Sequence, residues 1–123
     1  MTTAYQAYQQ DSVMAMPPEQ LLLRIYDALL RRIEEARRAL NSRDRARAGL
    51  AISKSLEIVS ALREALEPTT GAPCVPKLDQ LYRTVSTWLV EANVQQSPQL
   101  LDSSRRVIGT LKEGWDAAVL SLR

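Results

Sequence analysis

The chain has 123 residues, of which 46% are apolar and 24% charged, a composition typical of a soluble globular domain with a sizeable core. The net charge of +2 is too small to predict nucleic-acid binding. No stretch approaches the roughly 20 apolar residues of a membrane span, and the N-terminus lacks the pattern of a secretory signal, so we expect a cytoplasmic protein without membrane insertion.

Several classes of catalytic site are excluded by residue types that the chain lacks. Cys74 is the single cysteine, so the chain can form neither an intrachain disulfide nor a metal site with several cysteine ligands. The chain has no histidine, the commonest general base and metal ligand, and the di-iron centres of helical bundles normally use it. No glycine-rich phosphate loop is present. We therefore expect no enzyme activity, no cofactor and no metal.

The N-terminal part of the chain is polar and precedes the first helix signal. Residues 1–16 carry only scattered apolar side chains, and we expect a mobile or loosely docked arm. Pro17-Pro18-Glu19 starts a helix, because proline is tolerated in the first turn and a carboxylate complements the positive end of the helix dipole. This helix is predicted over residues 18–40, with its apolar stripe at Leu22, Tyr26, Leu29, Ile33, Ala36 and Leu40.

A second helix is predicted over residues 44–66, and Ser42 or Asp44 is suited to cap its N-terminus. Its stripe has the same alternating spacing of three and four residues and includes Ser55, whose small size allows a neighbouring helix to come close. The stripe consists of Ala48, Ile52, Ser55, Val59, Leu62 and Leu66. The segment that follows, residues 67–76, holds three prolines and a glycine and is the clearest loop of the chain.

The third and fourth helices are predicted over residues 76–95 and 98–122. The third has an unusually wide apolar face, because Leu81 and Trp88 form a second row beside the stripe of Leu78, Tyr82, Val85, Leu89 and Ala92. Ser97 and Pro98 provide a capping residue and a first-turn proline for the fourth helix. Its stripe consists of Leu101, Ser104, Ile108, Leu111, Trp115, Ala118 and Leu122.

Four helices of about 20 residues with short connections predict an all-α protein, an antiparallel up-down four-helix bundle over residues 17–123 with a short N-terminal arm. Apolar residues beside the stripes either flank the core or form grooves for a partner segment. They include Leu23, Ile25, Leu56, Ile58, Leu81, Trp88 and Val107. Seven arginines fall between residues 31 and 47 without interleaved aromatic residues, and we favour a solvated face over a nucleic-acid site.

Five motifs, in this order and at this spacing, resemble those of the flagellin-specific export chaperones of the FliS family, over nearly the whole chain. They are AYQQDSV at residues 7–13, PEQL followed by IYD within 18–27, ISKSLEIV at 52–59, LY followed by LVEAN within 81–93, and LKEGWDA at 111–117. The resemblance implies an antiparallel four-helix bundle that binds the disordered C-terminal segment of new flagellin in the cytoplasm. It also implies that this binding prevents premature polymerisation and supports delivery to the flagellar type III export gate.

On this resemblance, we expect the second to fourth predicted helices to line client grooves. The candidates are Ile52, Leu56, Val59, Tyr82, Val85, Trp88 and Leu89, of which Val59, Val85 and Leu89 also fit core positions. Tyr8 and Val13 are candidates for covering a groove in the free protein and for contact with the export gate. We expect a monomer or weak homodimer that binds no nucleic acid. The alternative function is a generic helical-bundle adaptor or a self-associating interaction module.

Overall fold

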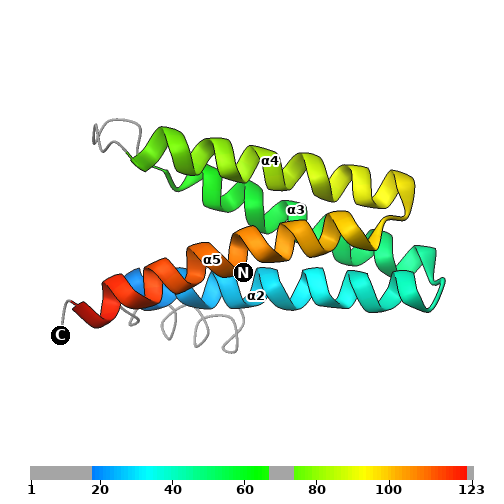
Figure 1. Ribbon diagram of the computed structural model, residues 1–123, viewed down its shortest axis with the longest axis horizontal. Coiled ribbons are helices and arrows are strands. Elements are labelled where there is room, and N and C mark those ends of the chain that lie inside the picture. Colours follow the sequence, from blue (N-terminus) through cyan, green and yellow to red (C-terminus); the bar gives the residue numbers. More distant parts are fainter. Residues whose placement is uncertain (1–17, 67–73, 122–123) are drawn as a thin grey trace, which may run out of the picture.

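Four amphipathic segments of the chain form four α-helices in the computed structural model, which describes residues 18–66 and 74–121 (Figure 1). They are α2 (Pro18–Asn41), α3 (Arg45–Glu64), α4 (Cys74–Gln95) and α5 (Pro98–Ser121). These two ranges contain no strand, so the predicted all-α fold is confirmed. The predicted arm over residues 1–16 and most of the predicted proline-rich loop lie outside the described residues.

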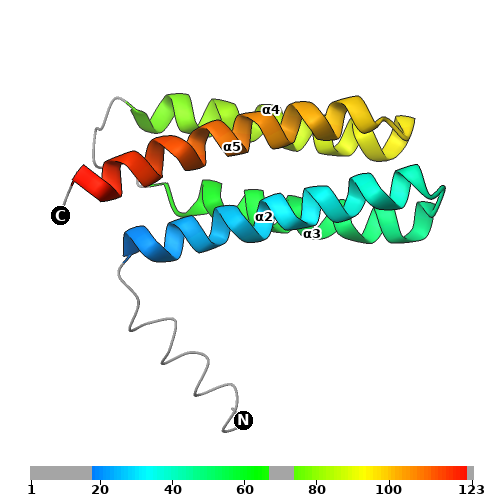
Figure 2. The ribbon, with the colours of Figure 1, turned by 60° about the horizontal axis from the view of Figure 1, so that its bottom comes forward.

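The helices run alternately in opposite directions, so that successive connections lie at opposite ends of the molecule (Figures 1 and 2). α2 packs against α3 and α5, and α4 packs against the same two helices. The four helices therefore form a ring in chain order, and contacts between α2 and α5 close it. This is the predicted antiparallel up-down bundle.

The turn between α2 and α3 shows how the sequence ends one helix and starts the next. Arg43 adopts a left-handed backbone conformation, with φ of 57°. The Asp44 N–H then donates to the Ala39 carbonyl at 2.9 Å. The Asp44 carboxylate accepts from the Arg47 N–H at 3.1 Å, which satisfies one free donor of the first turn of α3. Of the two predicted caps, Asp44 is the one that acts.

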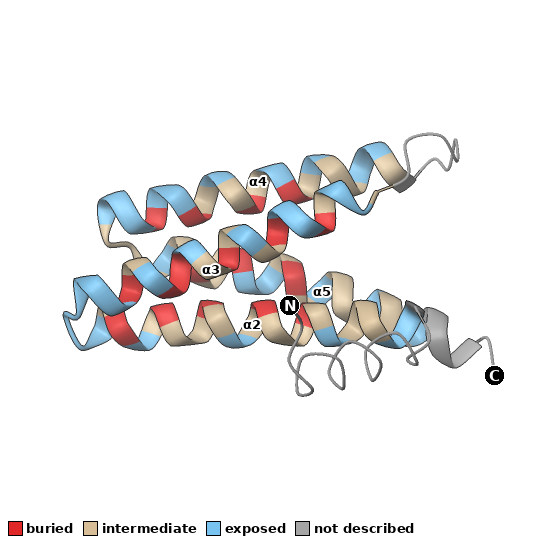
Figure 3. Cartoon of the chain, turned by 180° about the vertical axis from the view of Figure 1, so that it is seen from behind, coloured by how far each residue is buried: buried red, intermediate tan, exposed pale blue. Residues whose placement is uncertain are grey.

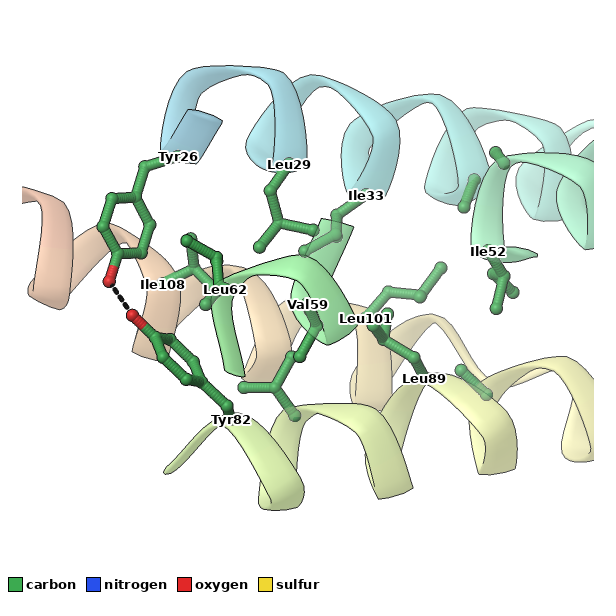
Figure 4. Packing of buried hydrophobic residues seen from close by; sticks show 14 residues of the cluster. Tyr26, Leu29, Ile33, Ile52, Val59, Leu62, Tyr82, Leu89, Leu101 and Ile108 are labelled. Atoms are coloured by element: carbon green, nitrogen blue, oxygen red, sulfur yellow. Dashed lines mark hydrogen bonds between the residues drawn. The ribbon is translucent and has the colours of Figure 1, made fainter. Parts of the chain in front are cut away.

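Apart from Ala51, the core is built from members of the predicted stripes of all four helices. The residues coloured as buried lie mainly along the helix faces that are turned toward one another (Figure 3). Side chains of the buried cluster, from all four helices, pack together between the helices (Figure 4). Two serines are buried with them, and each hydroxyl donates to the carbonyl four residues earlier: Ser55 to Ala51 and Ser104 to Leu100, both at 2.9 Å. The core members are Tyr26, Leu29, Ile33, Ala36, Ala51, Ile52, Val59, Leu62, Tyr82, Val85, Leu89, Ala92, Leu101 and Ile108.

Candidate functional site

Five of the seven predicted groove residues lie in the core rather than on the surface. Each of their side chains is at most 2% exposed: Ile52, Val59, Tyr82, Val85 and Leu89. The physical reason is that these residues belong to the inward stripes, and a four-helix bundle uses its inward stripes to pack the helices together. In the packed bundle they support the helices, and only Leu56 and Trp88 remain partly accessible.

Leu56 and Trp88 lie on opposite flanks of α4. Leu56 precedes Arg63 by two helical turns and shares its face of α3, and the Arg63 Nε–H donates to Asp79 of α4 at 3.0 Å. Leu56 therefore lies on the α3–α4 side. Trp88 follows Leu81 by two turns and shares its face of α4, which is turned toward α5. Both belong to the predicted set of groove residues, but the fold does not bring them together.

An apolar groove runs between α4 and α5. Its volume is about 290 Å³, and its lining consists of Leu81 from α4 and of Arg106, Val107, Thr110 and Leu111 from α5. Leu81 and Val107 belong to the apolar residues beside the predicted stripes, but neither is among the predicted groove candidates. They could have been predicted from apolar residues beside the stripes of two adjacent antiparallel helices, where each residue lies on the side of its helix that adjoins the other. A groove of this kind can accept the apolar side of a helical or extended segment.

Three aromatic residues from three helices meet at one end of the bundle. The hydroxyls of Tyr26 on α2 and Tyr82 on α4 form a buried hydrogen bond (Figure 4), and the Trp115 indole N–H of α5 donates to the Tyr26 hydroxyl at 3.0 Å. We call these residues the aromatic triad. Each comes from a different one of the motifs described above, so segments that are far apart in the sequence are joined here.

Burial sets the ionisation of the two tyrosines. It raises the pKa of both hydroxyls above that of an exposed tyrosine, because the charged form would lose its solvation. The hydrogen bond to Tyr26 raises the pKa of Tyr82 further. Both side chains are therefore neutral at physiological pH, and their hydrogen bonds connect α2, α4 and α5.

Ion pairs tie neighbouring helices together at the surface. Asp79 receives hydrogen bonds from Arg63 at 3.0 Å and from Arg83 at 2.8 Å, and its pKa is lowered chiefly by the bond from Arg63. On the α2–α5 side, Lys112 lies 2.9 Å from Asp27, which raises the pKa of the lysine. Because these groups are at least partly exposed to solvent, we expect each pair to contribute little to the stability of the fold.

The remaining predictions concern absences or residues outside the described ranges. Tyr8 and Val13 lie outside the described residues. Among residues 18–66 and 74–121, no His, Cys, Asp and Glu side chains gather in a group of three or more that could hold a metal ion. None of the helices in these ranges combines the length and apolar character needed to cross a membrane.

Comparison with known proteins gives a match over nearly the whole chain. The family model described as "Flagellar protein FliS" matches residues 1–121. The chain is 33% identical over 117 residues to flagellar secretion chaperone FliSB of Pseudomonas aeruginosa, covering 92% of this chain and 93% of that protein. It is 28% identical to flagellar secretion chaperone FliS of Vibrio cholerae, covering 94% of this chain and 88% of that protein. The corresponding chaperone of Bacillus subtilis is also 28% identical, over 97% of this chain and 88% of its own length.

Proposed function

The chain belongs to the FliS family of flagellar secretion chaperones, and we propose that it binds the C-terminal segment of flagellin in the cytoplasm. Binding would prevent premature polymerisation and support delivery of flagellin to the type III export gate. The observation that carries this proposal is the family match over residues 1–121, together with relatives that are named flagellar secretion chaperones. The proposal assigns no catalytic activity to the chain.

The surface of the bundle offers a place for such a client. The exposed surface of the α4–α5 groove is almost entirely apolar, and Leu81, Val107 and Leu111 lie along its walls. Trp88 lies two turns from Leu81 on the same face of α4. A flagellin segment with an amphipathic pattern would bury its apolar side here. Ordering a disordered client offsets part of the contact free energy, which suits a chaperone that must release its client at export.

A client that wraps around α4 would contact both of its flanks. Leu56 on the α3–α4 side and Trp88 on the α4–α5 side are the partly exposed members of the predicted groove set. The five core members would act indirectly, by holding α3 and α4 at the spacing that the client meets. Tyr8 and Val13 of the N-terminal arm would cover a groove in the free protein and contact the export gate.

The test is calorimetric titration with the C-terminal segment of flagellin from the same organism. We expect saturable one-to-one binding with a negative heat-capacity change, because apolar surface is buried, and little dependence on salt. Val107→Glu places a charge in the groove and should weaken binding about tenfold or more. Leu50→Glu is the matched control, because Leu50 is a 60% exposed apolar residue on α3 that does not line the α4–α5 groove.

Two outcomes would contradict the proposal. Absence of binding by a well-folded sample would favour the generic helical adaptor. A stable homodimer that is disrupted by Val107→Glu would instead favour a self-associating module, and sedimentation velocity would detect it. Because Val107 is half-buried, circular dichroism of each variant must first show unchanged helicity; Thr110→Glu, at an exposed residue of the same groove, provides a second variant.

A further inference from the structure

A second and larger groove lies between α2 and α5, on the other flank of α5 from the apolar groove. Its volume is about 850 Å³. In contrast to the apolar groove, it is lined mainly by charged side chains, five of which are arginines. The arginines of the lining are Arg31, Arg37, Arg38, Arg105 and Arg106. Leu30 is its apolar residue, and Gly109 leaves space open at its middle.

Most of the acidic charge in this groove is already neutralised within the protein. Four carboxylates line it, and three of them have a cation within 4 Å. Arg37 Nε and Asp102 Oδ1 lose their contact with solvent, and their geometry is that of an ion pair rather than a hydrogen bond. The three pairs are Arg37 with Asp102 at 2.9 Å, Arg38 with Glu34 at 3.7 Å and Lys112 with Asp27 at 2.9 Å.

The basic charge is neutralised less completely. Arg31 on α2 and the pair Arg105 and Arg106 on α5 are exposed and form no ion pair within residues 18–66 and 74–121. Glu113 is the one lining carboxylate without such a pair in the same ranges. The groove therefore holds three guanidinium groups and one carboxylate that have no ion pair in these ranges. The three guanidinium groups lie on both walls of the groove. Each guanidinium offers several N–H donors in a fork that matches a carboxylate.

The middle of the groove is open. A Cβ atom built on Gly109 would meet no other heavy atom within 4 Å, so the space above this residue is unfilled. Leu30, on the facing helix, supplies an apolar contact and packs against the core beneath it. The lining from Asp102 to Glu113 corresponds to about 17 Å along α5 at 1.5 Å per residue. This length accommodates about three turns of a partner helix.

We propose that the α2–α5 groove binds an acidic protein segment that carries carboxylates on both edges and an apolar residue between them. Its carboxylates pair with Arg31 on one wall and with Arg105 and Arg106 on the other, and its apolar residue lies over Gly109 against Leu30. The two grooves share Arg106 and Thr110 on α5, but their other lining residues differ, and the proposal does not depend on flagellin binding.

The lining favours a protein segment over a nucleic acid. Among the described residues, no aromatic side chain lines the groove, so these residues offer bases no platform on which to stack. The four carboxylates of the lining would also lie close to a phosphate backbone. A peptide can place its few carboxylates at the arginines and avoid these positions.

The first experiment measures fluorescence anisotropy of a labelled peptide of about 14 glutamate and leucine residues, with the leucines in one helical stripe. The full chain is titrated at low and high salt, and a peptide with glutamine in place of glutamate is the control. Arg31→Glu/Arg105→Glu is expected to weaken binding about tenfold or more. Arg45→Glu/Lys77→Glu changes the net charge equally at two exposed residues outside the groove and should retain binding.

A second pair of variants tests the open space without changing any charge. Gly109→Leu fills the groove and should abolish peptide binding, whereas Gly114→Leu adds the same side chain at a glycine of α5 that also has open space but does not line the groove. Both changes favour the helix, so loss of binding cannot be attributed to unfolding.

Three outcomes would overturn the proposal. The first is equal binding of the glutamate and glutamine peptides. The second is equal loss of binding in the arginine variant and its control. The third is tighter binding of a thymine oligonucleotide of the same length, which would make the groove a phosphate-backbone site. Flagellin titration of the same variants separates this result from the proposed function, because Arg31 and Arg105 lie outside the α4–α5 groove.

Discussion

Removing hydroxyl groups from the aromatic triad tests whether its hydrogen bonds hold the end of the bundle together. Tyr82→Phe removes one bond and leaves the Tyr26 hydroxyl with the Trp115 indole N–H as its partner. A single buried hydrogen bond contributes about 1 kcal/mol, so we expect the free energy of unfolding to fall by about that amount.

Tyr26→Phe should have a larger effect, because the Tyr26 hydroxyl is the shared partner of the other two groups. Its loss leaves the Tyr82 hydroxyl, on a side chain that is 2% exposed, without a hydrogen-bond partner among the described residues, which adds about 1–3 kcal/mol of desolvation cost. Trp115 is half-buried, and its N–H can recover a bond to water. We therefore expect a total loss of about 2–4 kcal/mol, a large part of the stability of a small domain.

The double variant makes the prediction sharper. With both hydroxyls replaced, Tyr82 is no longer an unsatisfied buried group, so the double variant should be no less stable than Tyr26→Phe alone. Urea unfolding followed by circular dichroism gives all four free energies, and the slopes must agree if they are to be compared. Additive losses, or a loss in Tyr82→Phe as large as in Tyr26→Phe, would refute the reasoning.

Two further predictions concern pH and the core. Because the pKa of both tyrosines is raised in the folded state, unfolding releases protons from them at high pH. Their contribution to the free energy of unfolding should therefore be constant below about pH 10 and fall as the pH rises above it. The Tyr26→Phe/Tyr82→Phe variant should show a shallower fall in urea titrations between pH 8 and pH 11, and an unchanged fall would contradict the assignment. Leu89→Ala should cost about 2–5 kcal/mol, since Leu89 is fully buried, whereas Val94→Ala at a 78% exposed side chain of the same helix should change thermal stability by about 0.5 kcal/mol at most. Equal effects of the two would mean that Leu89 does not lie in the core.

The sequence predicts the fold well because the burial pattern of a helix is local. Alternating spacing of three and four residues identifies the buried face of each helix, and Tyr26, Ile52, Leu89 and Ile108 all lie inside as their stripes predict. Helix ends are less regular. α4 begins at Cys74 rather than at Pro76, so Pro76 lies in its first turn. Proline is tolerated there because the backbone nitrogens of the first turn have no hydrogen-bond partner within the helix.

The candidate site is harder to predict, because periodicity shows which face of a helix is apolar but not which helix lies beside it. The helical spacing of Val85 and Leu89 fits a face that lines a surface groove as well as a face that packs into the core. Leu81 and Val107 meet across the α4–α5 groove only because α4 and α5 are adjacent and antiparallel. The hydrogen bond between Tyr26 and Tyr82 joins residues 56 apart in sequence, and no local pattern announces it.

The ring of helices also has a consequence for the order in which the chain folds. Three of its four interfaces join consecutive helices, and the Arg63–Asp79 bond closes a loop of only 16 residues. The bond from Trp115 to Tyr26 spans 89 residues, so closing that edge from an unfolded chain costs about 1.5 kcal/mol more in loop entropy. This cost disappears once the intervening helices have docked. From this difference in loop entropy we expect the α2–α5 interface to form last, after the interfaces between consecutive helices.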